Sequence, residues 1–348
     1  DLIKRYSNHV RYPVQMMVTK SREKERPEDA GDDYTPEYED YEELDTINSM
    51  TPIWKKRSSD VSDEDYNEFY KSTFHDFEDP ARTVSFHAEG TLEYDALLFI
   101  PSRAPFDLYS KDYEKGLALY SSNVLIQDKC AELLPDYYNF VRGVVDSQDV
   151  SLNISRETLQ HDRQLKAIAK RIEKRVTSEL EKMRDNDRES YGNFGRGLKF
   201  GIYSSYGMKA DELGDLLLFW SARENKMVTL AEYAAAMPEG QKAIYYAAGD
   251  NRDRLAKMPV VKGVLDRGYD VLLLTTDVDE FTFQAMRGYT AKNCPKVYED
   301  DAAREAAAKA VADGAEPETE DRFLELKNVA TGDLDLATEG EEKDAEQA

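Results

Sequence analysis

One loop in the sequence combines residue types suited to phosphate chemistry. Residues 151–160 read SLNISRETLQ. Asn153 or Ser155 can accept the first backbone N–H groups of a following helix, which places Arg156 in the first helical turn. A cation there opposes the helix dipole. The guanidinium therefore either pairs with a nearby acid such as Glu157, or is held out as a rigid, always charged fork for a phosphate on another domain.

Other catalytic signatures are missing from the sequence. There is no GxxxxGK[ST] loop, no GxGxxG turn after a strand and no GxSxG elbow. The four histidines have no metal-like spacing, and two cysteines are too few for a disulfide framework or a cysteine zinc cluster; these residues are His9, His75, His87, His161, Cys130 and Cys294. We therefore expect no metal site and no self-contained active site. The same lack of a site constellation argues against a hydrolase with paired carboxylates.

Charge excludes some classes of partner. The chain has 348 residues, with 70 acidic and 46 basic side chains and a net charge of −24. Nucleic-acid binding depends on basic groups that neutralise phosphates, so a nucleic-acid partner is not expected. No run approaches the ~18 apolar residues of a membrane span, and no leader is visible. With so few cysteines, a reducing cytoplasm fits best.

The negative charge is concentrated in two segments. Residues 21–46 have a net charge of −9 and residues 299–348 a net charge of −12. Segment 21–46 has almost no aliphatic residues, so it cannot bury enough apolar area to offset its ordering entropy and is predicted to be a solvated linker. The chain from about residue 313 is interpreted in the same way. Residues 304–312 (REAAAKAVA) predict a short exposed helix.

The rest of the chain predicts an α/β protein. Residues 50–150 contain a helix that Asp60 or Ser62 can cap, and strands at 83–88, 93–100, 117–126 and 140–145, with a short helix at 128–140. A second unit at 241–290 contains a strand at 243–248, a helix at 251–267 and a strand at 271–275, which is a βαβ pattern.

Helices are expected between these two units. The clearest covers residues 157–184, because its apolar residues follow helical spacing on one face: Leu165, Ile168, Ile172, Val176, Leu180 and Met183. Further helices are predicted at 187–200, 211–222 and 229–237. The expected fold is therefore two α/β/α layered subdomains joined by a small helical segment.

Several long motifs resemble one family. VRGVVDSQDVSLNISRETLQ (141–160) looks like the catalytic loop of the ninety-kilodalton heat-shock chaperones. Four other stretches agree in order: PIWKKRSSDVSDEDYNEFYKS (52–72), LLFIPSRAPFDLY (97–109), EYAAAMPEGQKAIYYAAGD (232–250) and GYDVLLLTTDVDEF (268–281). YSSNVLIQDKC (120–130) is more similar to the bacterial HtpG type than to the eukaryotic type.

The resemblance implies a division of the chain. Residues 1–20 would end an N-terminal ATPase domain, and 21–47 would be an acidic linker. A middle domain would comprise a large α/β subdomain (48–160), a helical connector (161–240) and a small α/β subdomain (241–295). Residues 296–348 would be an acidic, mostly disordered start of the C-terminal region. The ATP pocket and the dimerisation helices of the family would lie outside this chain.

The resemblance also implies roles for the loop. Arg156 matches the arginine that reaches the γ-phosphate of ATP when the domains close, an arginine-finger arrangement. Gln160 matches a partner in that loop, and Asn153 a residue that shapes it. An apolar patch that docks the N-terminal domain would consist of Leu125, Val150 and Leu152, although core packing explains these three equally well.

Client-binding residues are implied in two places. Trp54 matches an exposed tryptophan on a mobile loop, the alternative being a packed tryptophan that anchors the linker. Phe281 matches an aromatic residue used for clients, flanked by Glu280 and Phe283, the alternative being an ordinary amphipathic helix face. Such a mixture of apolar and acidic groups suits promiscuous binding.

The expected function is therefore that of a chaperone middle domain in the cytoplasm. ATP with Mg²⁺ would be bound by the N-terminal domain, so this chain alone is expected not to hydrolyse ATP. Its partners would be client proteins and that domain, without nucleic acid or membrane. The whole protein would be a homodimer and this segment a monomer. The alternative is a stand-alone client-binding or scaffold module without ATPase activity.

Overall fold

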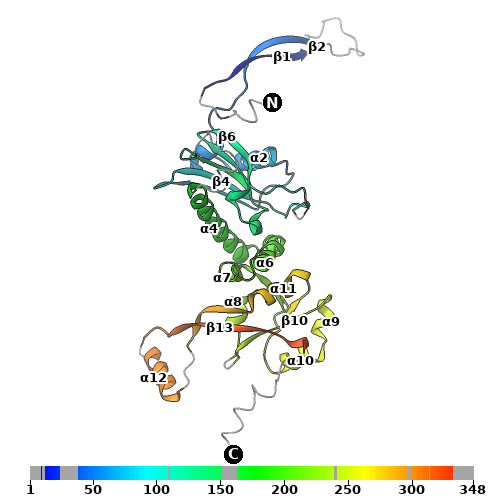
Figure 1. The fold of residues 1–348 in the computed structure, drawn as a ribbon, viewed down its shortest axis with the longest axis vertical. Helices are drawn as coiled ribbons and strands as arrows, with labels where there is room; N and C mark the ends of the chain where they lie inside the picture. The colour runs from blue at the N-terminus through cyan, green and yellow to red at the C-terminus, as the bar shows by residue number, and fades with distance from the viewer. Residues whose placement is uncertain are drawn as a thin grey trace, which may run out of the picture. The chain divides into compact units, whose positions relative to one another are not determined.

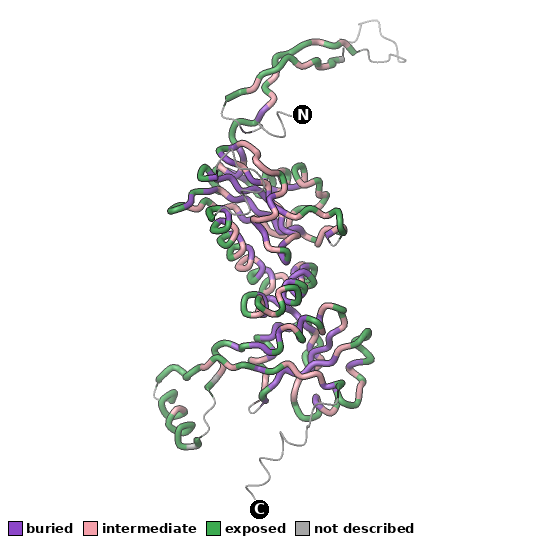
Figure 2. Tube along the Cα trace, in the orientation of Figure 1, coloured by how far each residue is buried: buried purple, intermediate pink, exposed green. Residues whose placement is uncertain are grey.

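The computed structural model describes residues 9, 12–23, 38–108, 110–150, 163–238, 241–296, 300–312 and 314–331. Contacts divide the chain into two compact units. Unit 1 contains residues 1–135 and 139–177, and unit 2 contains residues 136–138 and 178–348. Figure 1 shows both as mixtures of helices and strands, and Figure 2 shows that the buried residues concentrate in their sheets. Each unit is described by itself.

Unit 1 is built on a five-stranded sheet with the order β3-β4-β7-β5-β6. The strands are β3 (Arg82–Ala88), β4 (Tyr94–Ile100), β5 (Leu117–Ser121), β6 (Val124–Cys130) and β7 (Arg142–Ser147). The apolar run at 97–100 is almost fully buried, as expected for a strand that is covered on both faces. Only β5 and β7 pair in parallel.

Helices cover both faces of this sheet. α2 (Asp63–Phe74) begins at a capping box between Ser62 and Asp65, and its Tyr66 and Tyr70 pack with Leu97 and Phe99 of β4. The part of α4 (Arg163–Asn186) that belongs to unit 1, up to residue 177, follows the opposite face, where the Arg175 guanidinium lies over the Phe86 ring. The six apolar residues of the predicted stripe are all buried in α4. Unit 1 therefore has the expected α/β/α layering.

A hairpin precedes this sheet, and it corrects the prediction of a solvated segment for residues 21–23 and 38–46. β1 (Gln15–Glu23) and β2 (Tyr38–Thr46) pair in antiparallel register over nine residues each. Lys20 makes ion pairs with Glu43 and Asp45, each at 3.1 Å. At the base, Asn48 accepts from the Val14 N–H and donates to the Tyr12 carbonyl. Composition missed this hairpin because cross-strand hydrogen bonds and ion pairs need no apolar core.

Unit 2 has a six-stranded sheet with the order β12-β13-β10-β11-β8-β9. The strands are β8 (Leu218–Ser221), β9 (Lys226–Thr229), β10 (Ala243–Ala248), β11 (Leu272–Leu274), β12 (Gly288–Pro295) and β13 (Thr319–Asn328). β10 is parallel to both β11 and β13. β10 has the predicted bounds, and β11 lies inside the predicted strand at 271–275.

β10 contributes side chains to two cores, one on each face of the sheet. Tyr245 and Ala247 pack with Val261 and Val264 of α10 (Pro259–Asp266). On the other face, Tyr246 contacts Phe283 of α11 (Asp277–Met286). The predicted helix at 251–267 is two helices, α9 (Arg252–Ala256) and α10, because Pro259 at the first position of α10 cannot continue a preceding helix.

Short helices fill much of the region from 188 to 235. They are α5 (Arg188–Tyr191), α6 (Gly195–Ser204), α7 (Ala210–Leu213) and α8 (Leu230–Ala235), with 3-10 turns η5 (Gly192–Phe194) and η6 (Gly214–Leu216). The predicted helix at 211–222 is wrong beyond residue 216, because 218–221 pairs with β11 and β9 as strand β8. Its aromatic residues Phe219 and Trp220 favour a strand.

The predicted strand at 117–126 is a hairpin. Ser122 and Asn123 both have positive φ, as in the type I′ turns that join two antiparallel strands. β6 then extends to Cys130, so the predicted helix at 128–140 is replaced by 3-10 turns η3 (Ala131–Leu133) and η4 (Asp136–Tyr138). Further 3-10 turns are η1 (Ile53–Lys55), η2 (Ser58–Asp60) and η7 (Val329–Thr331).

The acidic C-terminal region contains regular structure. α12 (Asp301–Ala312) includes the predicted helix. The prediction that the chain lacks structure from about residue 313 is wrong for 319–328, which form β13 between β12 and β10. Leu324 is buried there, so a few apolar residues at alternate positions suffice when a sheet supplies the partners.

Candidate functional site

Trp54 lies at a buried polar centre of unit 1. Its indole Nε1 donates to Asp146 Oδ2 at 3.2 Å, and Lys55 Nζ lies 3.0 Å from the same oxygen. The Asn123 N–H donates to the other carboxylate oxygen at 3.3 Å. Only 3% of Trp54 is exposed. The expectation of an exposed Trp54 is therefore wrong, and the alternative of a packed tryptophan holds.

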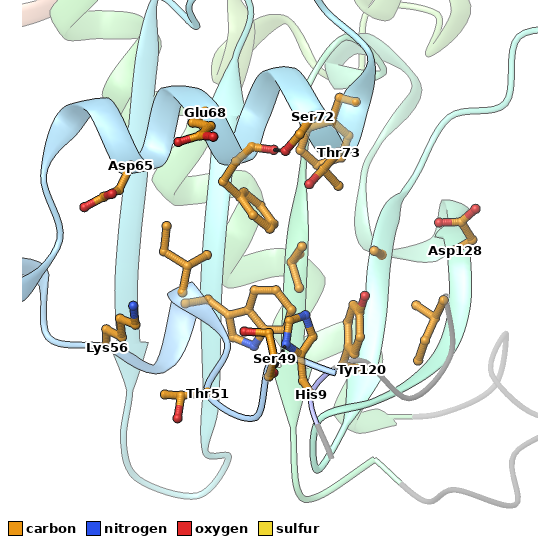
Figure 3. Close-up of a pocket in the computed structure, with 17 residues that line it drawn as sticks. His9, Ser49, Thr51, Lys56, Asp65, Glu68, Ser72, Thr73, Tyr120 and Asp128 are labelled. Atoms are coloured by element: carbon orange, nitrogen blue, oxygen red, sulfur yellow. Dashed lines mark hydrogen bonds between the residues drawn. The ribbon is translucent and has the colours of Figure 1, made fainter. Parts of the chain in front are cut away.

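A cleft of about 570 Å³ lies between α2 and the β5–β6 hairpin. Figure 3 shows Asp65, Glu68, Ser72 and Thr73 on the helix, with Tyr120 and Asp128 across the cleft. Burial lowers the pKa of His9 and raises that of Tyr120 to about 12. With a neutral histidine, acids outnumber bases in the lining, so the cleft does not fit a triphosphate.

Two phenylalanines that the sequence analysis did not single out are strongly exposed. Phe77 is 98% exposed and Phe106 is fully exposed, on the loops at 75–81 and 101–108. Glu78 joins the loops: it accepts from Ser102 Oγ at 2.6 Å and lies 3.4 Å from Arg103. The loops meet because Arg82 at the start of β3 pairs with Ile100 at the end of β4.

A sequence signal for this pair exists. Each phenylalanine has an acid next to it and a proline within three residues, in DFEDP and APFD, outside any apolar periodicity. A core residue would normally belong to such a pattern. Phe77 and Phe106 thus expose two large apolar side chains on loops that meet, and each offers apolar area that a bound protein would remove from water.

The three residues of the predicted client site around Phe281 all lie on α11 but differ in exposure. Phe281 is 50% exposed, and its ring centroid lies 5.6 Å from that of Tyr203 on α6. Phe283 is buried against Phe219 and Tyr246, so its side chain packs in the core and not at the surface beside Phe281. Glu280 is half-buried and lines a pocket of about 340 Å³ with Tyr246 and other residues.

A buried ion pair joins the two helices of this surface. Lys199 Nζ of α6 lies 2.6 Å from Asp279 Oδ1 of α11, and both side chains are less than one-tenth exposed. Asp279 also completes the capping box of α11 by accepting the Thr276 N–H. Thr282 Oγ1 donates to the Lys199 carbonyl at 3.1 Å. These contacts set the position of Phe281 relative to Phe200 and Tyr203.

The predicted phosphate-contacting loop lies outside the described residues. Segment 151–162 contains Arg156, Gln160, Asn153 and Leu152, and α4 begins at Arg163. Immediately before the segment, Val150 is buried and its carbonyl accepts from Ser121 Oγ at 2.5 Å. Leu125 is half-buried at the cleft. Packing accounts for Val150, and a docking role of Leu125 stays a prediction.

Within the described ranges, no group of three or more His, Cys, Asp or Glu side chains could hold a metal ion. A helix with the length and apolarity needed to cross a membrane is not found in these ranges either.

The sequence profile of the Hsp90 protein family matches residues 33–339. The chain belongs to the Hsp90 family. It is 48% identical over 333 residues to the chaperone protein HtpG of Oceanobacillus iheyensis, covering 94% of this chain and 52% of that protein. It is 50% identical over 305 residues to HtpG of Clostridium perfringens, covering 86% and 48%. The chain thus spans about half the length of these Hsp90 relatives.

A solved structure matches this part of the family. The middle domain of a Plasmodium falciparum heat shock protein superposes with a TM-score of 0.59 and 31% identity, covering 68% of this chain and 93% of that one. The α/β fold of this chain is therefore that of an Hsp90 middle domain.

Proposed function

We propose that this chain is the middle segment of a cytoplasmic HtpG-type Hsp90 chaperone that binds unfolded or partly folded clients and completes ATP hydrolysis by another domain. The exposed pair Phe77 and Phe106 carries the client part of the proposal. Exposed aromatic side chains lose apolar hydration when they bind a client, and this gain needs no particular client sequence. Phe281 with Phe200 and Tyr203 supplies a second such surface, in unit 2.

Replacing the exposed aromatics tests the client part. A chemically denatured enzyme is diluted into buffer with and without the chain, and light scattering reports aggregation. We expect the Phe77→Ala/Phe106→Ala variant to suppress aggregation much less than the parent chain, and Phe281→Ala to weaken suppression further. Phe323→Ala is the matched control, because Phe323 is 61% exposed but belongs to neither surface. Equal suppression by all variants contradicts the proposal.

The catalytic part rests on the family and on the loop sequence. The family's N-terminal ATPase domain would hold ATP together with Mg²⁺. Arg156 would contact the γ-phosphate of this ATP and neutralise charge in the transition state. Asn153 and Gln160 would hold the loop in place. Since the cleft between α2 and the β5–β6 hairpin does not fit a triphosphate, the chain would contribute the arginine to a site that another domain completes.

ATP turnover by that N-terminal domain, with and without this chain, tests the catalytic part. The parent chain is expected to stimulate turnover, and Arg156→Ala is expected to lower this stimulation at least about tenfold. In the full-length protein, Arg156→Ala should leave the affinity for ATP nearly unchanged. Arg163→Ala is the control, because Arg163 is an exposed arginine at the start of α4. Equal loss of turnover and ATP affinity contradicts the role of Arg156.

A stand-alone client-binding module is the second candidate, and the exposed aromatic surfaces are compatible with it as well. It predicts aggregation suppression without any stimulation of ATP turnover, so the two experiments together separate the candidates. In the first candidate, the partners would be client proteins, the ATPase domain and a second copy of the full-length protein.

A further inference from the structure

β3 is an edge strand whose outer side is open among the described residues. It pairs with β4 in an uninterrupted register of seven residues and stands last in its sheet. Half of the backbone N–H and C=O groups of an edge strand point away from its neighbour. No described backbone hydrogen bond outside the β3–β4 ladder reaches residues 82–88.

The other edge strands of the two large sheets are protected. β6 pairs with β5 through register shifts, and β12 has a register shift between Ala291 and Cys294. β9 has only four residues. Bulges and short lengths are the usual protection of an edge against pairing with another chain, as are proline and charged side chains, especially lysine, within the strand. β3 (RTVSFHA) has no bulge, lysine or proline, and its one arginine, Arg82, stands at its first position.

The open edge leads directly to the exposed aromatic pair. Phe77 precedes Arg82 by five residues, and Phe106 follows Ile100, the partner of Arg82, by six. A strand added beside β3 would therefore have one end at the loops that carry Phe77 and Phe106. Its backbone would meet the open hydrogen-bonding groups of β3, as in other peptide complexes formed by strand addition.

The faces of β3 indicate which peptide would fit. Val84 and Phe86 lie on the face toward α4, and Thr83, Ser85 and His87 lie on the other face. Because side chains of neighbouring strands line up across a sheet, the fitting partner alternates apolar and polar residues. We propose that β3 binds an extended client segment of this alternating kind by strand addition, with an apolar end at Phe77 and Phe106. The inference rests on the proposed client-binding function.

Backbone-methylated peptides test the hydrogen-bonding edge without changing the side chains. The probe is a fluorescein-labelled peptide of alternating valine and threonine, with phenylalanine at one end and lysine at the other. Two derivatives carry N-methyl groups on all valines or on all threonines, which blocks one peptide edge or the other. The anchored end and the apolar face fix which edge meets β3, so one derivative should bind the full chain at least tenfold more weakly and the other within twofold of the parent. Equal affinities of all three peptides, or equal losses in both derivatives, overturn the inference.

Amide hydrogen exchange resolved by residue supplies the second readout. We expect the parent peptide to slow exchange of alternate amides of β3, whereas amides of β6 stay unchanged. Protection confined to the loops at 75–81 and 101–108, lost in Phe77→Ala/Phe106→Ala, would overturn strand addition but leave the client surface intact. If the parent peptide does not bind and Phe77→Ala/Phe106→Ala suppresses aggregation as well as the parent chain, both strand addition at β3 and the proposed client surface are overturned.

Discussion

The indole of Trp54 donates to the carboxylate of Asp146, which lies 92 residues away in the sequence and is almost completely buried. This bond ties the chain after the β1–β2 hairpin to the central strand β7. It explains why Trp54 is part of the core rather than a surface contact.

Removing this carboxylate should destabilise unit 1. Asp146→Ala leaves the Trp54 N–H and the Lys55 ammonium without their partner, so we expect a loss of about 3–5 kcal/mol in unfolding free energy. Urea unfolding followed by Trp54 fluorescence in a Trp220→Phe background measures it. Glu64→Ala, at an exposed position of α2, should change stability by no more than about 0.5 kcal/mol. Similar values for the two variants would contradict this account.

The Lys199–Asp279 pair predicts non-additive effects in unit 2. Lys199→Met leaves a buried carboxylate and should cost about 3–5 kcal/mol, whereas Lys199→Met/Asp279→Leu removes both charges and should be more stable than the single variant. Trp220 fluorescence in a Trp54→Phe background reports the unfolding. If the losses of unfolding free energy in Lys199→Met and in Asp279→Leu add up to the loss in the double variant, the two charges do not interact as their 2.6 Å distance indicates.

His9 predicts a pH dependence of unit 1. Its Nδ1–H donates to the Ser49 carbonyl at 3.0 Å, and its ring packs on Trp54. Burial lowers the pKa of His9 below the ordinary value of 6.5, against the weaker upward effect of the Ser49 carbonyl and Asp146. The unfolded chain therefore binds a proton that the folded state resists, and stability falls as the pH drops below 6.5.

His9→Gln should remove this component. We expect the parent chain to lose stability more steeply than the variant between pH 7 and about pH 5, as measured by urea unfolding with Trp54 fluorescence. The two proteins differ only at residue 9, so the difference between their two profiles isolates His9. Parallel profiles would rule the histidine out.

Gly143 marks a close approach between β7 and β4. Its φ is +153°, and a Cβ there would lie 2.3 Å from the Leu97 carbonyl oxygen. Because backbone atoms cannot move aside, Gly143→Ala should cost about 2–4 kcal/mol in unfolding free energy. Gly192→Ala is the control, since a Cβ at Gly192 meets nothing within 4 Å. A neutral Gly143→Ala would show that the strands separate easily.

Local pattern predicted many elements correctly. The 3.6-residue spacing in α4, the bounds of β10 and the α/β layering follow from where apolar residues recur along the chain. Errors occurred where long-range pairing overrides composition: β2 and β13 are strands although their sequences are acidic, and 218–221 is a strand although helix was predicted.

The amino-acid sequence alone determined the fold class, the family resemblance and the candidate arginine loop, because these depend on residue types in a fixed order. Only the tertiary structure decided which aromatics reach solvent. Trp54 is buried because Asp146, His9 and Tyr120 converge on it from distant segments, while Phe77 and Phe106 stay exposed on the two loops at one end of the β3–β4 pair. Exposure depends on neighbours brought together by folding, and a linear pattern does not contain those neighbours.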